Sequence, residues 1–259
     1  KDDYKKWWET ARREMKKDGH FKLPTKKSEP IEYQVQDVSL EERLLGEFNN
    51  ARGLKARLVV VAEIAKSARD LGDAGVMAEG TFDKLNGEIN DHARTKPGLA
   101  LEAIMVRDDF AKALGVELTE EAPNDATVWA AEPQLAELVT SISATCQRRA
   151  LESFQAYDDE WADTLIDIIN QAPVRLVNES VSLLAAGGQL DAIKSELGKL
   201  INHHAAGAEL LLWLAKDKSG DFAEILTPET FGAMLSAIER ETTDEKRACK
   251  LRDFLLTDT

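Results

Sequence analysis

Residues 39–48, SLEERLLGEF, open the helical body that decides the fold of this chain. Ser39 and Glu42 stand at the spacing of a capping box, in which the serine side chain accepts a hydrogen bond from a free backbone amide and the glutamate reaches back to the cap. The apolar side chains that follow recur at helical spacings, namely Leu40, Leu44, Leu45 and Phe48. This pattern predicts an amphipathic helix that begins after Ser39.

Apolar stripes with the same period continue to the end of the chain, separated by glycines, prolines and polar turns. Each stripe predicts one more helix. The expected helices span residues 54–71, 74–94, 97–114, 133–157, 159–171, 174–186, 189–203, 205–216, 228–241 and 244–257. Short helices joined by short loops cannot each bury a face alone. We therefore expect an all-α fold of antiparallel helices stacked in order, similar in style to HEAT repeats.

The first 38 residues differ from this body. Residues 2–17 predict a helix with one apolar stripe, which consists of Tyr4, Trp7, Trp8, Ala11 and Met15. Residues 20–38 contain two prolines and no helical period, so we expect an extended strap over the helices. Residues 116–125 are acidic and aperiodic, which favours a boundary there. The predicted parts are an arm (1–38), a first helical bundle (39–118) and a helical-repeat region (119–259).

Charge is distributed unevenly between this arm and the rest of the chain. Residues 1–30 contain ten Lys or Arg and six Asp or Glu, whereas the remaining residues contain 23 basic and 41 acidic residues. Clustered Lys and Arg bind a phosphate backbone, so we expect only the arm, and not the acidic body, to bind nucleic acid. The residues expected to contact an anionic partner are Lys5, Lys6, Trp7, Trp8, Arg12, Arg13, Lys16, Lys17, Lys26 and Lys27.

Trp7 and Trp8 allow two interpretations, between which the sequence does not choose. Both lie on or beside the apolar stripe and, in the simpler case, they pack the first helix against the body. In the other case they join the neighbouring Lys and Arg in a basic and aromatic surface for phosphate or for an acidic protein. The burial of the two rings distinguishes these interpretations.

No segment has the pattern of a catalytic or metal-binding site. The chain lacks a phosphate-binding loop, a dinucleotide glycine fingerprint, a nucleophile elbow and a Cys-x-x-Cys pair. His203 and His204 are adjacent, so on a helix their side chains point about 100° apart and rarely ligate one ion. The acidic residues 120–121 and 158–160 fall at expected helix starts, where carboxylates stabilise free amides. We expect a protein that is not an enzyme and that has no cofactor, metal or small-molecule substrate.

Membrane and secretion signals are not evident in the sequence. The longest apolar run, residues 58–62, is far shorter than the roughly 20 residues that span a bilayer. The charged start of the chain lacks the apolar core of a secretory signal. Cys146 and Cys249 stand far apart and are expected to be buried free thiols in a reducing cytoplasm. These features predict a cytoplasmic protein.

The arm resembles a segment of a known family. The residues that carry the resemblance are Lys6-Trp7-Trp8, Ala11-Arg12-Arg13, Lys16-Lys17-Asp18-Gly19, Phe21, Leu23-Pro24, Lys26-Lys27 and Glu29-Pro30-Ile31. They are similar to the arm of long, multi-domain relatives of the bacterial transcription elongation factor GreA, in which a Lys-Trp-Trp helix and a basic strap precede a large helical region. Residues 210–214, 226–240 and 250–256 resemble later helices of that region.

The resemblance implies a role in transcription, although one feature of Gre factors is missing. Gre factors insert a coiled coil into the secondary channel of RNA polymerase, and acidic residues at its tip help to hold the Mg²⁺ that cleaves backtracked RNA. The nearest stretch here has Asp73 at the first acidic position but Val76 at the second. One carboxylate does not supply the paired charge that the ion needs. We expect the accessory N-terminal region of a longer Gre-like protein, without the coiled coil and the C-terminal domain.

These observations give one leading hypothesis and two alternatives. The leading hypothesis is a non-catalytic module of a Gre-like elongation factor that binds RNA polymerase or nearby nucleic acid through the arm. The first alternative is a helical-repeat scaffold that binds another protein through its acidic body, while the arm only packs. The second is an enzyme assembled from scattered residues, which would require a pocket with converging titratable groups.

Overall fold

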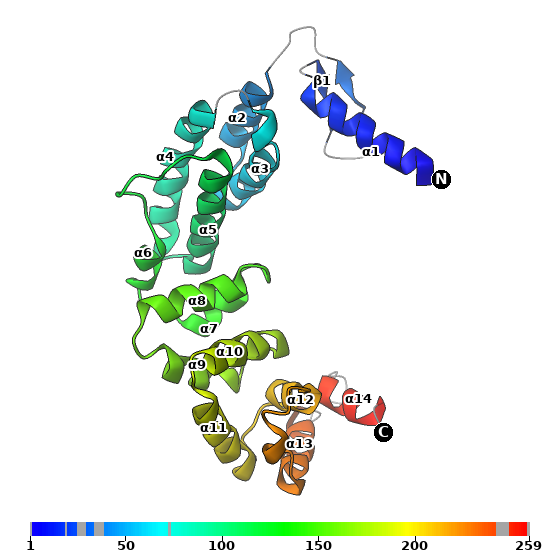
Figure 1. Ribbon diagram of the computed structural model, residues 1–259, viewed down its shortest axis with the longest axis vertical. Helices are drawn as coiled ribbons and strands as arrows, with labels where there is room; N and C mark the ends of the chain where they lie inside the picture. The colour runs from blue at the N-terminus through cyan, green and yellow to red at the C-terminus, as the bar shows by residue number, and fades with distance from the viewer. Residues whose placement is uncertain are drawn as a thin grey trace. The chain divides into compact units, whose positions relative to one another are not determined.

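A computed structural model describes residues 2–18, 20–24, 30–33, 39–71, 74–241 and 249–257. As predicted, the fold of these residues is all-α, apart from one short two-stranded ribbon (Figure 1). The helices are α1 (Asp2–Lys17), α2 (Leu40–Asn50), α3 (Leu54–Lys66), α4 (Ala74–Ala93), α5 (Pro97–Leu114), α6 (Asp125–Trp129), α7 (Leu135–Ser141), α8 (Gln147–Tyr157), α9 (Trp161–Ile169), α10 (Val174–Ala186), α11 (Leu190–Asn202), α12 (Ala208–Lys216), α13 (Pro228–Glu241) and α14 (Lys250–Thr257). The 3-10 helices are η1 (Ala68–Asp70) and η2 (Ala223–Ile225), and the strands are β1 (Phe21–Lys22) and β2 (Glu32–Tyr33).

The chain forms two units, residues 1–132 and 133–259. The first unit contains α1 to α6 and the ribbon, and the second contains α7 to α14. The sequence did not predict α6, which belongs to the first unit because it packs against α4 and α5. The predicted division of the body into domains at residue 118 stays a prediction.

Four antiparallel helices, α2 to α5, form the body of the first unit (Figure 1). Their register is fixed by contacts between side chains of neighbouring helices. Arg57 near the start of α3 pairs with Glu88 near the end of α4, and Phe82 of α4 packs edge-to-face on Phe110 of α5, with 5.4 Å between ring centroids. α5 is the central helix, because it packs against α3, α4 and α6 at once.

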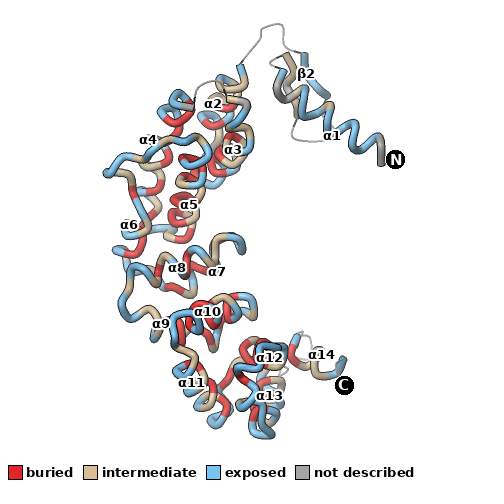
Figure 2. The backbone as a smooth tube through the Cα atoms, viewed as in Figure 1, coloured by how far each residue is buried: buried red, intermediate tan, exposed pale blue. Residues whose placement is uncertain are grey.

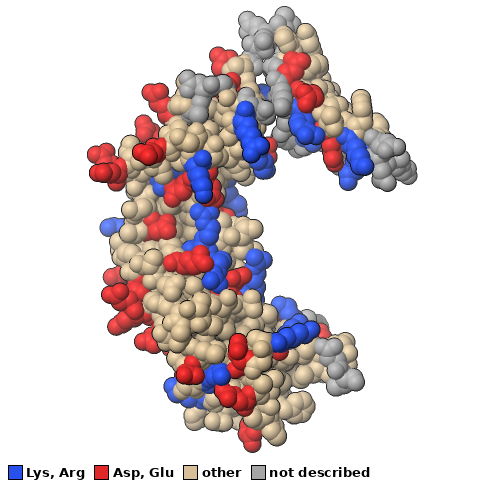
Figure 3. Space-filling view, viewed as in Figure 1, with Lys and Arg blue, Asp and Glu red and all other residues tan. Residues whose placement is uncertain are grey.

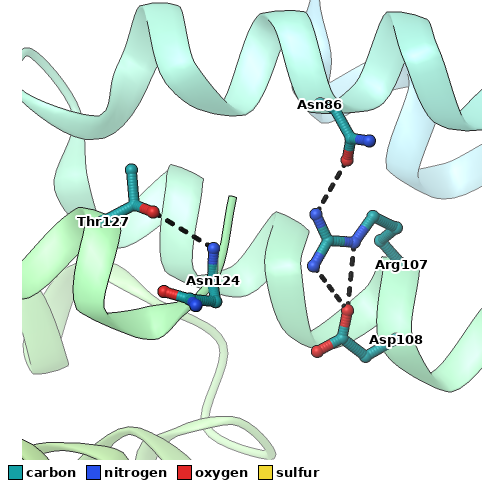
Figure 4. Close-up of polar contacts among 5 residues, drawn as sticks. All are labelled: Asn86, Arg107, Asp108, Asn124 and Thr127. Carbon is teal, nitrogen blue, oxygen red and sulfur yellow. Dashed lines mark hydrogen bonds and ion pairs between the residues drawn. The ribbon is translucent and has the colours of Figure 1, made fainter. Parts of the chain in front are cut away.

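Caps explain where several helices begin and end. The Ser39 hydroxyl accepts a hydrogen bond from the Glu42 backbone amide at 3.1 Å, so the predicted N-cap of α2 is confirmed. Gly115 ends α5 in the left-handed conformation that favours glycine, with φ of 68°. At the start of α6 the Asn124 backbone amide donates to the Thr127 hydroxyl at 3.1 Å (Figure 4).

The second unit is built from two rows of helices. α8, α10, α12 and α14 pack side by side in one row, and α9, α11 and α13 pack in the other. Polar contacts tie successive helical pairs together, and one example is the Trp213 indole, whose N–H donates to the Asn178 amide oxygen at 3.4 Å. The helices thus stack in chain order, whereas the comparison with HEAT repeats stays a prediction.

Several local predictions were wrong. The helix predicted over 54–71 ends at Lys66 and is followed by the 3-10 helix η1. The helix predicted over 133–157 is two helices, α7 and α8, because hydroxyl side chains at the break bond locally and compete with the helix. The Ser141 hydroxyl donates to the Leu138 carbonyl at 2.7 Å, and the hydroxyls of Ser143 and Thr145 lie 3.2 Å apart. Residues 20–38 were predicted to form an extended strap over the helices, yet within them β1 and β2 pair with each other, with Phe21 opposite Tyr33.

Candidate interaction surface

The basic side chains predicted to bind a partner are displayed openly on α1. Lys5, Lys6, Arg12 and Arg13 are exposed, and none of these four side chains forms an ion pair with another described residue. Six of the eight predicted cations therefore lie on one helix, and the structure describes the side chains of these four. The side chains of Lys16 and Lys17 are not described, and Lys26 and Lys27 lie outside the described residues.

The aromatic side chains at the start of α1 are exposed as well. Tyr4, Trp7 and Trp8 are 67%, 60% and 37% exposed. Their rings form a row, with centroids 5.8 Å apart for Tyr4 and Trp7 and 6.3 Å apart for Trp7 and Trp8. Figure 2 shows no buried residue in the described part of α1. This exposure does not fit the interpretation in which both tryptophans pack the helix against the body.

The ribbon covers only the later turns of α1. β1 packs against α1, where Ala11 and Met15 are half-buried. Tyr33 of β2 is 67% exposed, and the imidazole of His20 stacks on it with the ring centroids 5.7 Å apart. The backbone N–H of His20 donates to the Asp18 carboxylate at 3.0 Å and holds the pKa of Asp18 below its ordinary value. The open surface therefore consists of the three aromatic rings and two lysines of the first two turns of α1, together with the exposed Arg12 and Arg13 further along the helix.

Several basic residues of the body are engaged in pairs, in contrast with those of α1. Lys194 lies 2.9 Å from Glu224, and Lys250 lies 3.0 Å from Glu209. Arg107 is only 2% exposed, so it serves the core of the first unit rather than a partner.

Figure 4 shows how Arg107 is held between α4 and α5. Its Nη1 donates to the Asn86 amide oxygen at 2.7 Å, and its Nε and Nη2 both donate to one Asp108 oxygen. The sequence did not indicate this role, because a single arginine within an apolar stripe carries no recognisable motif. The feature that reveals the role of Arg107 is its position on α5, a helix enclosed by its neighbours.

The residues considered for metal or catalytic chemistry do not converge. His203 and His204 are exposed, and the nearest polar contact of His204 is the Ser236 hydroxyl, 3.0 Å from its Nδ1. In the part of the chain that is described, no group of three or more His, Cys, Asp or Glu could hold a metal ion. Asp73 lies outside the described residues, and Val76 is exposed on α4. Cys146 and Cys249 are free thiols, as predicted, but only Cys249 is buried, whereas Cys146 is half-buried.

Comparison with known proteins gives two matches, both to family models. The GRAD helix-turn-helix domain matches residues 1–38, and the GreA-associated C-terminal domain matches residues 40–241, which is more than half of the chain. The chain belongs to the GreA-associated C-terminal domain family. No curated protein and no solved structure matches.

Membership of the GreA-associated C-terminal domain family confirms the predicted link with GreA-associated proteins. The predicted position as the N-terminal region of a long GreA relative stays a prediction. The two family matches meet at residue 39, the N-cap of α2, so the basic helix and ribbon fall in the first match. Among the described residues of this GreA-associated protein, no helix is both long and apolar enough to cross a membrane.

Proposed function

We propose that this chain is a non-catalytic interaction module of a GreA-related transcription elongation factor that acts in the cytoplasm. In this proposal α1 binds RNA polymerase or the nucleic acid beside it. The observation that carries the proposal is that one helix presents three exposed aromatic rings and four exposed cations, none of which forms an ion pair with another described residue. A contiguous exposed apolar surface with a charged border is typical of a binding site.

The positions of these side chains suit an anionic partner. On a helix, Arg12 follows Trp8 by four residues, so the two side chains lie on one face. Aromatic rings and cations together bind bases by stacking and phosphates by charge. The match of residues 1–38 to a helix-turn-helix domain supports the same assignment, because such domains place a helix against nucleic acid.

Charge reversal on α1 tests this proposal. The variant with Lys5, Lys6, Arg12 and Arg13 changed to Glu should bind purified RNA polymerase, alone and with a nucleic-acid scaffold, at least about tenfold more weakly than the unchanged chain. The matched control reverses four exposed cations of the body, Lys66, Arg69, Lys112 and Lys218.

Circular dichroism should show the same helix content for both variants. Equal binding by the α1 variant and the unchanged chain would contradict the proposal. Equal losses in the α1 variant and the control would also contradict it, because net charge rather than α1 would then govern binding.

A second candidate function has one observation in its favour. Phe231 and Leu235, one turn apart on α13, are 54% and 48% exposed. Phe231 and Leu226 hold the positions of a hydrophobic staple at the start of α13, which is the structural explanation of that pair. Leu235 has no such explanation, and acidic residues border it on the same helix. This face suits a basic amphipathic helix of another protein.

Removing residues 1–38 distinguishes the two functions. If the truncated chain still captures its partner and Leu235→Asp releases it, the body is the binding surface. If the truncated chain captures nothing, the proposed role of α1 is supported.

A further inference from the structure

One end of the bundle in the first unit gathers two turns that are far apart in sequence. The turn between α2 and α3 and the turn between α4 and α5 lie at the same end, because the helices alternate in direction. The pairing of Arg57 with Glu88 fixes this arrangement, since it joins the first turns of α3 to the last turns of α4. Side chains of residues 52–55 and 94–96 therefore share one end of the bundle.

These two turns carry four exposed cations, Arg52, Lys55, Arg94 and Lys96, which we name the bundle-end cluster. No ion pair joins any of the four to another described residue. The turns are also alike in sequence, because each carries Ala-Arg followed by a lysine. Figure 3 shows that Lys and Arg gather on one side of the first unit, whereas Asp and Glu dominate the other side.

Two helix N-termini add positive potential at this end. α3 has 13 residues and α5 has 18, and both begin here. Neither has a side-chain cap on its first amides or an acidic residue in its first turn. Free N–H groups and the positive pole of each helix dipole therefore accompany the four cations.

The neutral residues around the cluster favour a nucleic acid over an acidic protein. Asn49, Asn50, Asn90 and Thr95 are exposed beside the cations, and such side chains commonly donate to phosphate oxygens. A protein interface would be expected to have an apolar centre. The nearest exposed large apolar residue on these helices is Val59, which lies one turn beyond Lys55.

We infer that the bundle-end cluster is a second surface for the phosphate backbone of a nucleic acid, separate from α1. It departs from the expectation that only the arm, and not the acidic body, binds nucleic acid. The net charge of the body conceals a local excess of cations, since Glu47 and Asp91 are the exposed acidic residues within four positions of the two turns along the chain. The inference goes beyond the proposed function and stands or falls independently of α1.

Fluorescence anisotropy with a labelled DNA duplex and a labelled single strand tests the inference on the full chain. The cluster variant changes Arg52, Lys55, Arg94 and Lys96 to Gln, and the control variant changes Lys66, Arg69, Lys112 and Lys218 to Gln. A third variant changes Lys5, Lys6, Arg12 and Arg13 to Gln, and a fourth combines it with the cluster variant.

The cluster variant should bind DNA more weakly than the control variant. The combined variant should likewise bind DNA more weakly than the α1 variant. Its plot of log affinity against log salt concentration should be shallower by about 0.9 for each duplex phosphate that a cation no longer neutralises. Circular dichroism and the thermal midpoint should match those of the control, because all four cations are exposed.

Three results would overturn the inference. In the first, the cluster variant has the affinity and salt slope of the control. In the second, the α1 variant alone removes all DNA binding, which leaves the proposed function standing. In the third, a polyglutamate peptide competes as well as unlabelled DNA at equal charge, which would assign the cluster to an acidic protein. If instead the cluster variant loses binding and the α1 variant does not, the inference stands and the role of α1 in nucleic-acid binding fails.

Discussion

Gly207 is the residue at which the second unit has no space for a side chain. It precedes α12, and an added Cβ would collide with the backbone carbonyl oxygen of Asn170. The Asn170 side chain keeps the two backbones close together. It accepts a hydrogen bond from the Gly207 amide at 2.7 Å and donates one to the Ala205 carbonyl at 3.2 Å. Gly207→Ala should therefore lower the free energy of unfolding by about 1–3 kcal/mol, measured by denaturant titration.

Gly198 is the matched control for that substitution. It lies inside α11, and an added Cβ would meet nothing within 4 Å. Gly198→Ala should raise the free energy of unfolding by about 0.5–1 kcal/mol, since alanine loses less backbone entropy in a helix. If both substitutions changed stability in the same direction, the steric account of Gly207 would be wrong.

Glu229 gives a pH prediction at the start of α13. The hydrogen bond from the Thr227 side chain lowers the pKa of Glu229. Because its pKa in the folded state lies below that in the unfolded state, the stabilisation is complete above the unfolded value of about 4.3 and is lost as the pH falls through the folded value. An NMR titration should find the Glu229 midpoint below that of an ordinary glutamate, and Thr227→Val should raise it. If the Glu229 midpoint were the same in Thr227→Val, the hydrogen bond from Thr227 would not be the cause of the lowered pKa.

At the scale of helices, the buried Arg107 stabilises the packing of α5 against α4. Arg107→Ala would leave the Asn86 amide oxygen without its donor and open a cavity between the two helices. We expect the free energy of unfolding to fall by about 2–4 kcal/mol. Lys112→Ala, on the exposed side of α5, should change it by less than about 0.5 kcal/mol. Comparable effects of the two substitutions would contradict a structural role for Arg107.

Helices with clear caps were predictable to the residue, whereas the shortest elements were not. α5, α10 and α13 have the predicted bounds, because Pro or Gly stands at their ends. β1 and β2 have two residues each and α6 has five, which is too few to show a period. Ala113 of α5 is exposed although it is apolar, because the helix is enclosed by neighbours on its other sides.

At the scale of the whole molecule, composition located one candidate surface and missed the other. The cations and aromatic residues of α1 adjoin in sequence, so a count of charges was enough to find them. Their exposure required the structure, because the same stripe also suits packing. Arg52 and Arg94 are brought to one end of the bundle only by the antiparallel helices. No linear pattern joins residues so far apart in the chain.

The most direct test of the role of α1 is site-specific photo-crosslinking in the full chain. A photoreactive phenylalanine analogue in place of Trp7 should crosslink to RNA polymerase or to the bound nucleic acid. The same group in place of Tyr157, an exposed aromatic residue of the second unit, should give no such product. Crosslinks from position 157 and none from position 7 would contradict the central claim that α1 contacts the partner.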